Sequence, residues 1–161
     1  MGVYLDTNIF YNAYCPVEHN VLADWLLTQL TPRFQGVTCE WTILEMFRAL
    51  KKQVNLKKIE EKTAKIVLDF FLSELGEMVE ENVMKLIAVT RSAIMVSRRQ
   101  IFERNLYAAD ALHASTALAS QVVLFITFDK DFRGNLATIP IINPTDPKFR
   151  DKIFTLMQNS E

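Results

Sequence analysis

Two aspartates follow apolar runs that have the length and composition of buried strands. Asp6 comes directly after Val3–Leu5, and Asp129 follows shortly after Val122–Ile126. The carboxyl ends of parallel strands face one crevice, where α/β sheets bind their ligands, so the two carboxylates could act at one site. Asp6 could equally serve only as the N-cap of the helix that follows it, because Asp caps helices well. Asp6 by itself leaves both interpretations open.

Glu45 is a third candidate acid, and it lies within an apolar pattern of helical spacing. Residues three and four apart share a helix face, so Glu45 lies on one face with Arg48 and Lys52. This arrangement is compatible with a solvent-exposed acid beside cations. It is equally compatible with an acid that is directed into a cleft bordered by two cations.

Asp110 is the fourth candidate acid, in the first turn of a predicted helix over 108–120, where the helix dipole favours a negative charge. The same side of that helix carries His113 among small alanine residues, which would allow close packing against a sheet. We interpret His113 as a half-buried structural histidine rather than a metal ligand, since imidazole has many other uses.

Four carboxylates that converge on one edge of a sheet repel one another and raise one another's pKa. Hard divalent cations with oxygen ligands remove this cost, so the set Asp6, Glu45, Asp110 and Asp129 predicts bound Mg²⁺ or Mn²⁺, as one ion or two. Such a site keeps bound waters and holds substrate phosphates. Replacing Asp6 with Asn should relieve the repulsion, so that the metal-free protein keeps or gains stability.

The elements that would position these acids alternate between strand-like and helix-like patterns. Such alternation predicts an α/β fold in three layers, with a central parallel sheet flanked by helices on both faces. The length favours one domain over 1–161, with an extra C-terminal helix over about 147–158 capped by Asp146. The predicted strands are 3–5, 36–39, 78–79, 122–126 and 138–142; the other predicted helices are 17–30, 40–50, 56–76, 82–102 and 108–120, and 12–16 is predicted as a loop.

Composition excludes several classes of protein. A hydrophobic share of 50% with 23% charged residues argues against disorder, and a net charge of −1 excludes strong bulk attraction to nucleic acid. No apolar run approaches the ~18 residues of a membrane span, and the amino terminus lacks a secretory signal. Cys15 and Cys39 lack metal-ligand spacing, which predicts free, reduced thiols in a cytoplasmic protein.

Taken together, these residues resemble a PIN domain over nearly the full chain. The matching segments are Val3–Asn8, the helical Glu45, Tyr107–Ala114 and Ile126–Phe132, in the family's order. At this compact size the chain is most similar to the VapC toxins of prokaryotic toxin–antitoxin pairs. The resemblance implies four catalytic and metal-binding acids, supported by further polar residues, namely Asp6, Glu45, Asp110 and Asp129, with Asn8, Thr127 and the additional acid Asp131 in support.

The resemblance also implies a function and partners. Such a PIN domain would be a metal-dependent endoribonuclease that hydrolyses phosphodiester bonds of single-stranded RNA, with a metal-bound water as the nucleophile. An antitoxin protein would lay a helix in an apolar groove of the toxin and direct a basic side chain toward the acids. The basic residues that could form a track for RNA phosphates are Arg48, Lys52, Arg98, Arg99, Arg104, Lys130 and Arg133.

We also expect a homodimer, because several helices carry more apolar residues than one core face needs. Adaptable or aromatic residues are common at such interfaces. The residues expected to supply this surface are Met46, Phe47, Leu50, Phe154 and Met157.

Three alternative functions stay open. One is a PIN nuclease of RNA maturation or decay that has no antitoxin, and a second is a PIN-like module that binds RNA or protein without cleaving it. A third is a receiver or phosphatase fold, which would need consecutive acids early in the chain, where this sequence has Asp6-Thr7-Asn8. The region from Lys51 to Arg104 matches no family motif, so the subfamily and the RNA target are open.

Overall fold

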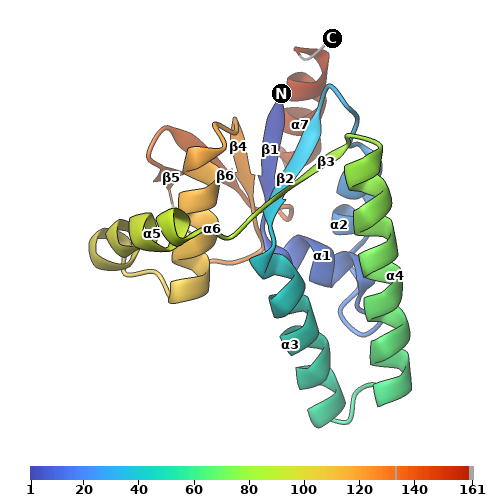
Figure 1. Ribbon diagram of the computed structural model, residues 1–161. Coiled ribbons are helices and arrows are strands. Elements are labelled where there is room, and N and C mark those ends of the chain that lie inside the picture. Colours follow the sequence, from blue (N-terminus) through green and yellow to red (C-terminus); the bar gives the residue numbers. More distant parts are fainter. Residues whose placement is uncertain (133, 160–161) are drawn as a thin grey trace.

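A six-stranded sheet runs through the part of the chain that the computed structural model describes, residues 1–132 and 134–159 (Figure 1). Its strands are β1 (Gly2–Leu5), β2 (Gln35–Cys39), β3 (Met84–Ile87), β4 (Leu124–Ile126), β5 (Asn135–Leu136) and β6 (Ile139–Ile142). They follow the order β3-β2-β1-β4-β6-β5, and every neighbouring pair is parallel except β5 with β6. β1 therefore lies between β2 and β4, and its carboxyl end meets theirs at one edge.

Helices cover both faces of this sheet, which confirms the predicted three-layer α/β fold (Figure 1). In the described residues they are α1 (Thr7–Tyr14), α2 (Val21–Thr28), α3 (Trp41–Asn55), α4 (Glu61–Glu80), α5 (Arg91–Arg104), α6 (Ala108–Ala119) and α7 (Phe149–Gln158). Helices α1 to α4 and α7 lie on one face, and α5 and α6 lie on the other.

Each face of the sheet has its own apolar core because successive side chains of a strand point to opposite sides. In β1, Val3 and Leu5 belong to the core shared with α1 to α4 and α7, whereas Tyr4 belongs to the core shared with α6. The Tyr4 ring stacks on Phe125 of β4 with ring centroids 5.1 Å apart. Helix α6 contributes Ala111, Ala114 and Ala117 to this core, and Ala114 and Ala117 are among the small residues predicted to pack against the sheet.

The strand predicted at 78–79 is wrong, and the helix predicted over 82–102 is correct only from Arg91 onward. Helix α4 continues through Gly76 to Glu80, and the left-handed Asn82 (φ 63°) turns the chain into β3. A short apolar run fits a strand or a helix equally well by spacing. The pairing of β3 with β2, with Met84 opposite Gly36, decides for the strand, and α5 begins only at Arg91.

Two predicted boundaries also shift. The loop predicted over 12–16 begins later, because α1 extends to Tyr14. The C-terminal helix α7 begins at Phe149, with Lys148 as its N-cap. Asp146 supports the preceding turn instead, since its carboxylate accepts a hydrogen bond from the Lys148 N–H at 2.9 Å.

The residues expected at an interface divide between core and surface. Met46 and Leu50 are fully buried in the chain's own core, so they are unavailable to a partner. Phe47 and Phe154 are 40% and 47% exposed. Both cysteines are buried free thiols, as predicted. Among the described helices, none has the length and apolar character that crossing a membrane requires.

Candidate active site

All four predicted acids line one cleft of about 460 Å³ at the carboxyl edge of the sheet. Asp6 follows β1, Asp129 lies three residues after β4, and α3 and α6 supply Glu45 and Asp110. In Figure 1 this edge lies at the lower ends of the strands, where α3 and α6 begin. The remaining residues that line the acidic cleft are Thr7, Asn8, Tyr11, Arg48, Ala49 and Lys52.

Asp6 is the most constrained of the four acids. One oxygen accepts a hydrogen bond from the Thr7 N–H at 2.7 Å, and the other accepts from Asn8 and from the Thr127 hydroxyl, each at 2.6 Å. Asp6 is therefore both the N-cap of α1 and a wall of the cleft, so the two interpretations of this residue coexist. Burial raises the pKa of the Asp6 carboxyl, and the charge of His113 and the hydrogen bond from Thr127 partly oppose that rise.

Asn8 and Thr127 connect the first acid to the last. The Asn8 amide donates to the Thr127 hydroxyl at 2.9 Å and accepts from the Phe128 N–H at 2.9 Å. The Thr127 hydroxyl oxygen also accepts from the Asp129 N–H at 2.9 Å. Asn8 thus contacts the first acid, and Thr127 contacts both the first acid and the backbone of the last.

Glu45 is held by a partner that the sequence interpretation did not assign to it. The His113 Nε2 lies 2.6 Å from a Glu45 oxygen, and the Thr7 hydroxyl donates to that same oxygen. These contacts and the charge of His113 lower the pKa of Glu45, although burial alone would raise it. Glu45 is thus a fixed carboxylate whose side chain is 27% exposed.

His113 is fully buried rather than half-buried, and it links α6 to β1, β2 and α3. Its Nδ1 lies 2.8 Å from the Tyr4 hydroxyl and 3.6 Å from the Cys39 sulfur. Burial lowers the pKa of the imidazole, but the hydrogen bonds to Cys39 and Glu45 outweigh burial, so the pKa lies well above its ordinary value. A signal was present in the sequence, because His113 follows Asp110 by three residues on the same helix face.

Asp110 shows the electrostatic tension of the acidic cleft. Burial, followed by the charges of Asp6, Asp129 and Glu45, raises the pKa of Asp110 to about 6. Asp131 is exposed and does not line the acidic cleft. Its backbone N–H donates a hydrogen bond to an Asp129 oxygen at 2.8 Å. The structure thus brings four of the five candidate acids together.

The basic residues predicted to contact RNA are distributed over three places. Arg48 and Lys52 line the acidic cleft, and the exposed Lys130 follows Asp129 directly. Arg104 donates to the carbonyl of Asn135 at 2.8 Å, beside Asp110. Arg98 and Arg99 on α5 are both exposed and contact residues of the same helix: Arg98 lies over the Phe102 ring, and Arg99 pairs with Glu103. The seventh predicted residue, Arg133, lies outside the described residues.

The donor chemistry of the acidic cleft fits a hard divalent cation, because carboxylate oxygens are the ligands that Mg²⁺ and Mn²⁺ prefer. The raised pKa of Asp110 shows that a positive charge would be favourable there. Over residues 1–132 and 134–159, no three Asp, Glu, His or Cys side chains stand close enough to hold an ion as they are placed.

Asp110 makes the stability of the metal-free protein depend on pH. The Asp110 carboxyl titrates near pH 6 in the folded chain. In the unfolded chain it titrates near the ordinary aspartate value of about 3.9. The folded state binds more protons between these values, so its stability falls as the pH rises from about 4 to 6. With allowance for solvent screening, this loss is about 1–2 kcal/mol.

Urea unfolding in EDTA from about pH 4 to about pH 7 spans this titration and measures the loss. In Asp110→Asn the fall should be smaller by that amount, and Mg²⁺ should raise the melting temperature of the wild type more than that of the variant. Identical pH profiles for the two proteins would contradict the prediction.

The protein is a three-layer α/β domain with an acidic cleft at the carboxyl edge of its sheet. The family model of the PIN domain matches residues 3–135. The chain therefore belongs to the PIN domain family, as the resemblance predicted. A search of curated protein sequences finds no match.

Solved structures with the same fold include two toxin–antitoxin complexes. VapBC2 from Rickettsia felis, bound to a DNA fragment from its promoter, is 19% identical with a TM-score of 0.62, covering 89% of this chain and 98% of that one. A toxin–antitoxin complex from Klebsiella pneumoniae is 21% identical, with a TM-score of 0.56 and coverage of 88% and 97%. PAE2754 from Pyrobaculum aerophilum is 18% identical, with a TM-score of 0.61 and coverage of 98% and 96%. At these identities the likeness establishes the fold.

Proposed function

We propose that this protein is a divalent-metal-dependent endoribonuclease that hydrolyses single-stranded RNA, as the toxin of a toxin–antitoxin pair. PIN domains are generally nucleases, and two of the similar structures are toxin–antitoxin complexes. The observation that carries the proposal is the convergence of Asp6, Glu45, Asp110 and Asp129 in one cleft beside Arg48 and Lys52. Carboxylates that bind a metal ion, next to basic side chains that bind phosphate, suit a phosphodiester substrate.

In this mechanism each residue has a separate task. Asp6, Glu45, Asp110 and Asp129 would hold one or two Mg²⁺ or Mn²⁺ ions. A bound ion supplies an activated water and stabilises negative charge on the phosphate oxygens. Asn8 and Thr127 keep Asp6 in place through hydrogen bonds of 2.6 Å. His113 holds Glu45, so that the Glu45 carboxylate keeps its orientation when the strand binds.

Glu45 and Lys52 should separate catalysis from binding. We expect Glu45→Gln to lower the cleavage rate by about 10²-fold, because its charge acts in the transition state. Lys52→Ala should instead weaken binding of single-stranded RNA and reduce the salt slope by about 0.7, the contribution of one phosphate contact. Fluorescent RNA in Mn²⁺ gives the rate, and fluorescence anisotropy against salt concentration gives the slope.

The matched control is Lys62→Ala, an exposed lysine on α4 outside the acidic cleft. It should leave both the rate and the salt slope unchanged. EDTA should stop cleavage in every variant. Equal, salt-independent losses in Glu45→Gln and Lys52→Ala would mean that the two changes disturb folding rather than a shared RNA site.

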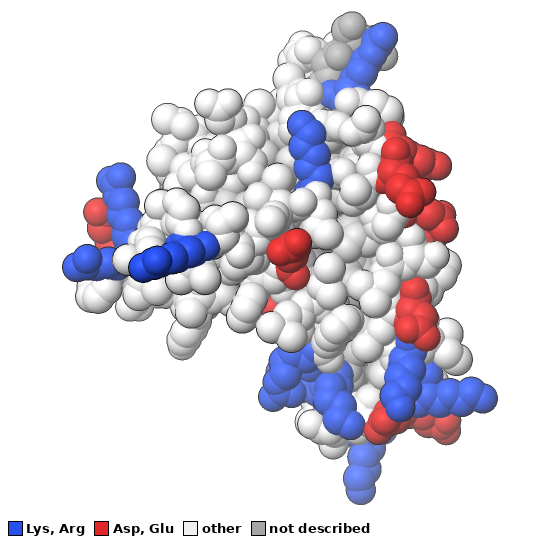
Figure 2. Space-filling view, in the orientation of Figure 1, with Lys and Arg blue, Asp and Glu red and all other residues white. Residues whose placement is uncertain are grey.

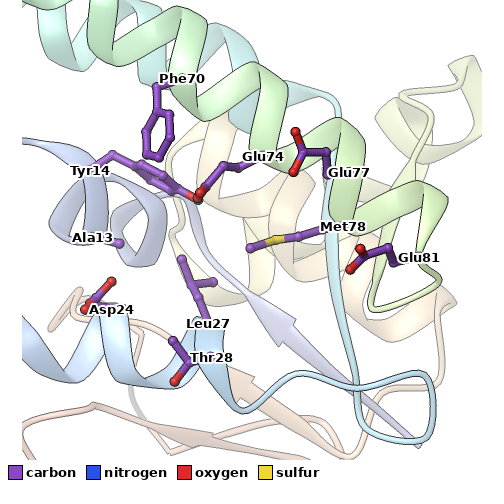
Figure 3. Close-up of a pocket in the computed structure, with 10 residues that line it drawn as sticks. All are labelled: Ala13, Tyr14, Asp24, Leu27, Thr28, Phe70, Glu74, Glu77, Met78 and Glu81. Carbon is purple, nitrogen blue, oxygen red and sulfur yellow. The ribbon is translucent and has the colours of Figure 1, made fainter.

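A second depression, of about 390 Å³, fits the expected antitoxin helix (Figure 3). Tyr14, Leu27, Phe70 and Met78 give it apolar walls between α1, α2 and α4, as Figure 3 shows. The charged residues that line it are all acidic, and acidic side chains continue over that end of α4 in Figure 2; these lining acids are Asp24, Glu74, Glu77 and Glu81. A partner helix with apolar and basic residues on one face would complement both features.

Charge reversal of the lining acids should therefore weaken antitoxin binding. The combined change Glu77→Lys and Glu81→Lys is expected to lower affinity for the antitoxin encoded next to this gene at least about tenfold, with most of the effect lost at high salt. Asp69→Lys, on the exposed side of the same helix, is the matched control and should change little. Unchanged affinity in the double variant would place the partner elsewhere.

Two related alternatives have their own discriminators. The absence of a neighbouring gene for a DNA-binding antitoxin, together with metal-dependent cleavage, would indicate a nuclease of RNA maturation or decay. RNA binding without cleavage at saturating Mn²⁺ would indicate a non-cleaving module. The proposed homodimer would use the expected interface residues that remain exposed, Phe47 and Phe154, at 40% and 47%, and sedimentation at micromolar concentration tests it.

A further inference from the structure

A depression beside the acidic cleft combines an exposed aromatic ring with hydrogen-bonding groups. We call it the Tyr107 depression; it has a volume of about 390 Å³ and is lined by Arg104, Asn105, Leu106, Tyr107, Asp110 and Asp131. Asp110 also lines the acidic cleft, so the two cavities meet at this carboxylate. A strand that passes Asp110 in the cleft therefore reaches the Tyr107 depression next.

The Tyr107 ring is exposed on a well-anchored backbone. The residue is 78% exposed, yet it is the N-cap of α6 and its carbonyl accepts from the Ala111 N–H at 2.8 Å. Asn105 ends α5 in the left-handed conformation (φ 55°), which Asn tolerates, and Leu106 is buried. A large ring that is left in water on an ordered backbone is a preformed surface for stacking a flat ligand.

The groups around the ring suit a nucleobase rather than another phosphate. Asp110 and Asp131 are carboxylates, and an additional phosphate beside them would be repelled. The Asn105 amide offers both a donor and an acceptor to the edge of a base. Arg104 also lines the depression, and its guanidinium is positioned by the hydrogen bond of 2.8 Å to the Asn135 carbonyl.

We propose that the Tyr107 depression is a base-binding subsite, in which the Tyr107 ring stacks on a base of the RNA strand next to the cleaved phosphate. Asn105 contacts the edge of that base. This subsite rests on the proposed ribonuclease function and adds to it a position that contacts a base rather than the backbone. Stacking of this kind accepts every base, because each has a flat ring face.

The test is binding of a fluorescein-labelled single-stranded RNA of mixed sequence and about 12 nucleotides, in Ca²⁺ so that the strand stays intact. Tyr107→Ala should weaken binding about 5- to 150-fold, the range for loss of one stacked base. Tyr107→Trp should keep the affinity and show quenching of its indole on binding, beyond any change from Trp25 and Trp41 in the wild type. An abasic strand of equal length should bind the wild type and Tyr107→Ala equally.

The matched control is Phe102→Ala, because Phe102 is 79% exposed but is covered by Arg98 at 5.8 Å and lies outside the depression. It should bind RNA as the wild type does. Equal RNA affinity of the wild type and Tyr107→Ala would overturn the subsite and leave the ribonuclease proposal standing. A wild type that neither binds nor cuts RNA in Mn²⁺ would overturn both. Altered sedimentation of Tyr107→Ala with unchanged RNA affinity would assign the ring to a protein contact, and would also overturn the subsite.

Discussion

Asp6→Asn is expected to lower the rate of RNA cleavage by at least about 10²- to 10³-fold, because it removes a negative charge that acts directly on the reacting centre. The amide keeps the shape of the carboxylate, so RNA should still bind through Arg48 and Lys52. Cleavage of labelled RNA at saturating Mg²⁺ and Mn²⁺ measures the rate, and anisotropy in Ca²⁺ measures the binding.

The hydrogen bonds of Asp6 change what we expect of the variant's stability. From the sequence, loss of a repelling charge should keep or raise it. In the structure, Asp6 accepts from Thr7, Asn8 and Thr127, and the NH₂ group of Asn would face at least one of these donors. An unsatisfied donor pair of this kind costs about 1–3 kcal/mol, which opposes the gain from reduced repulsion.

The matched control for Asp6→Asn is Asp151→Asn, an exposed carboxylate on α7 that lies outside the acidic cleft. It should leave the rate and the melting temperature unchanged. Wild-type cleavage by Asp6→Asn at saturating metal would remove Asp6 from the site and, with it, the role that we assign to Asn8 and Thr127.

His113→Ala is expected to destabilise the fold by about 3–5 kcal/mol, the range for breaking a buried charged pair. The imidazole is fully buried and contacts Tyr4, Cys39 and Glu45, so its removal leaves a cavity and buried polar groups without a partner. A loss of this size is a large part of the ~5–15 kcal/mol that holds a typical domain together. Urea unfolding at pH 7 measures it, and wild-type stability in the variant would contradict it.

The charge on His113 also gives this contribution a pH dependence. The folded pKa of His113 lies well above that of the unfolded chain, so the added stability is complete below about pH 6.5 and is lost as the pH rises through the folded pKa. The matched control is His19→Ala, since His19 is the other histidine and is exposed. It should change the free energy of unfolding by less than about 0.5 kcal/mol.

The sequence by itself determined the layers of the fold and the meeting of the acids. Apolar runs that alternate with amphipathic segments leave a parallel sheet with helices on both faces as the arrangement that buries them. Asp6 and Asp129 follow strands in such a sheet, and Asp110 lies in the first turn of a helix, so local position alone brings them to one edge. The structure places these acids, together with Glu45, in one cleft.

Only the tertiary structure decided the identity of β3 and the partners of the acids. The run that contains Met84 fits a strand or a helix, and pairing with β2 makes it a strand. His113 meets Glu45 across 68 positions of sequence and Tyr4 across 109, and no local spacing encodes such contacts. Arg98 and Arg99 share the sign of Arg48 but lie on α5, away from the cleft. Local periodicity specifies which face of an element is buried, whereas the neighbour that covers that face is set by the packing of the whole chain.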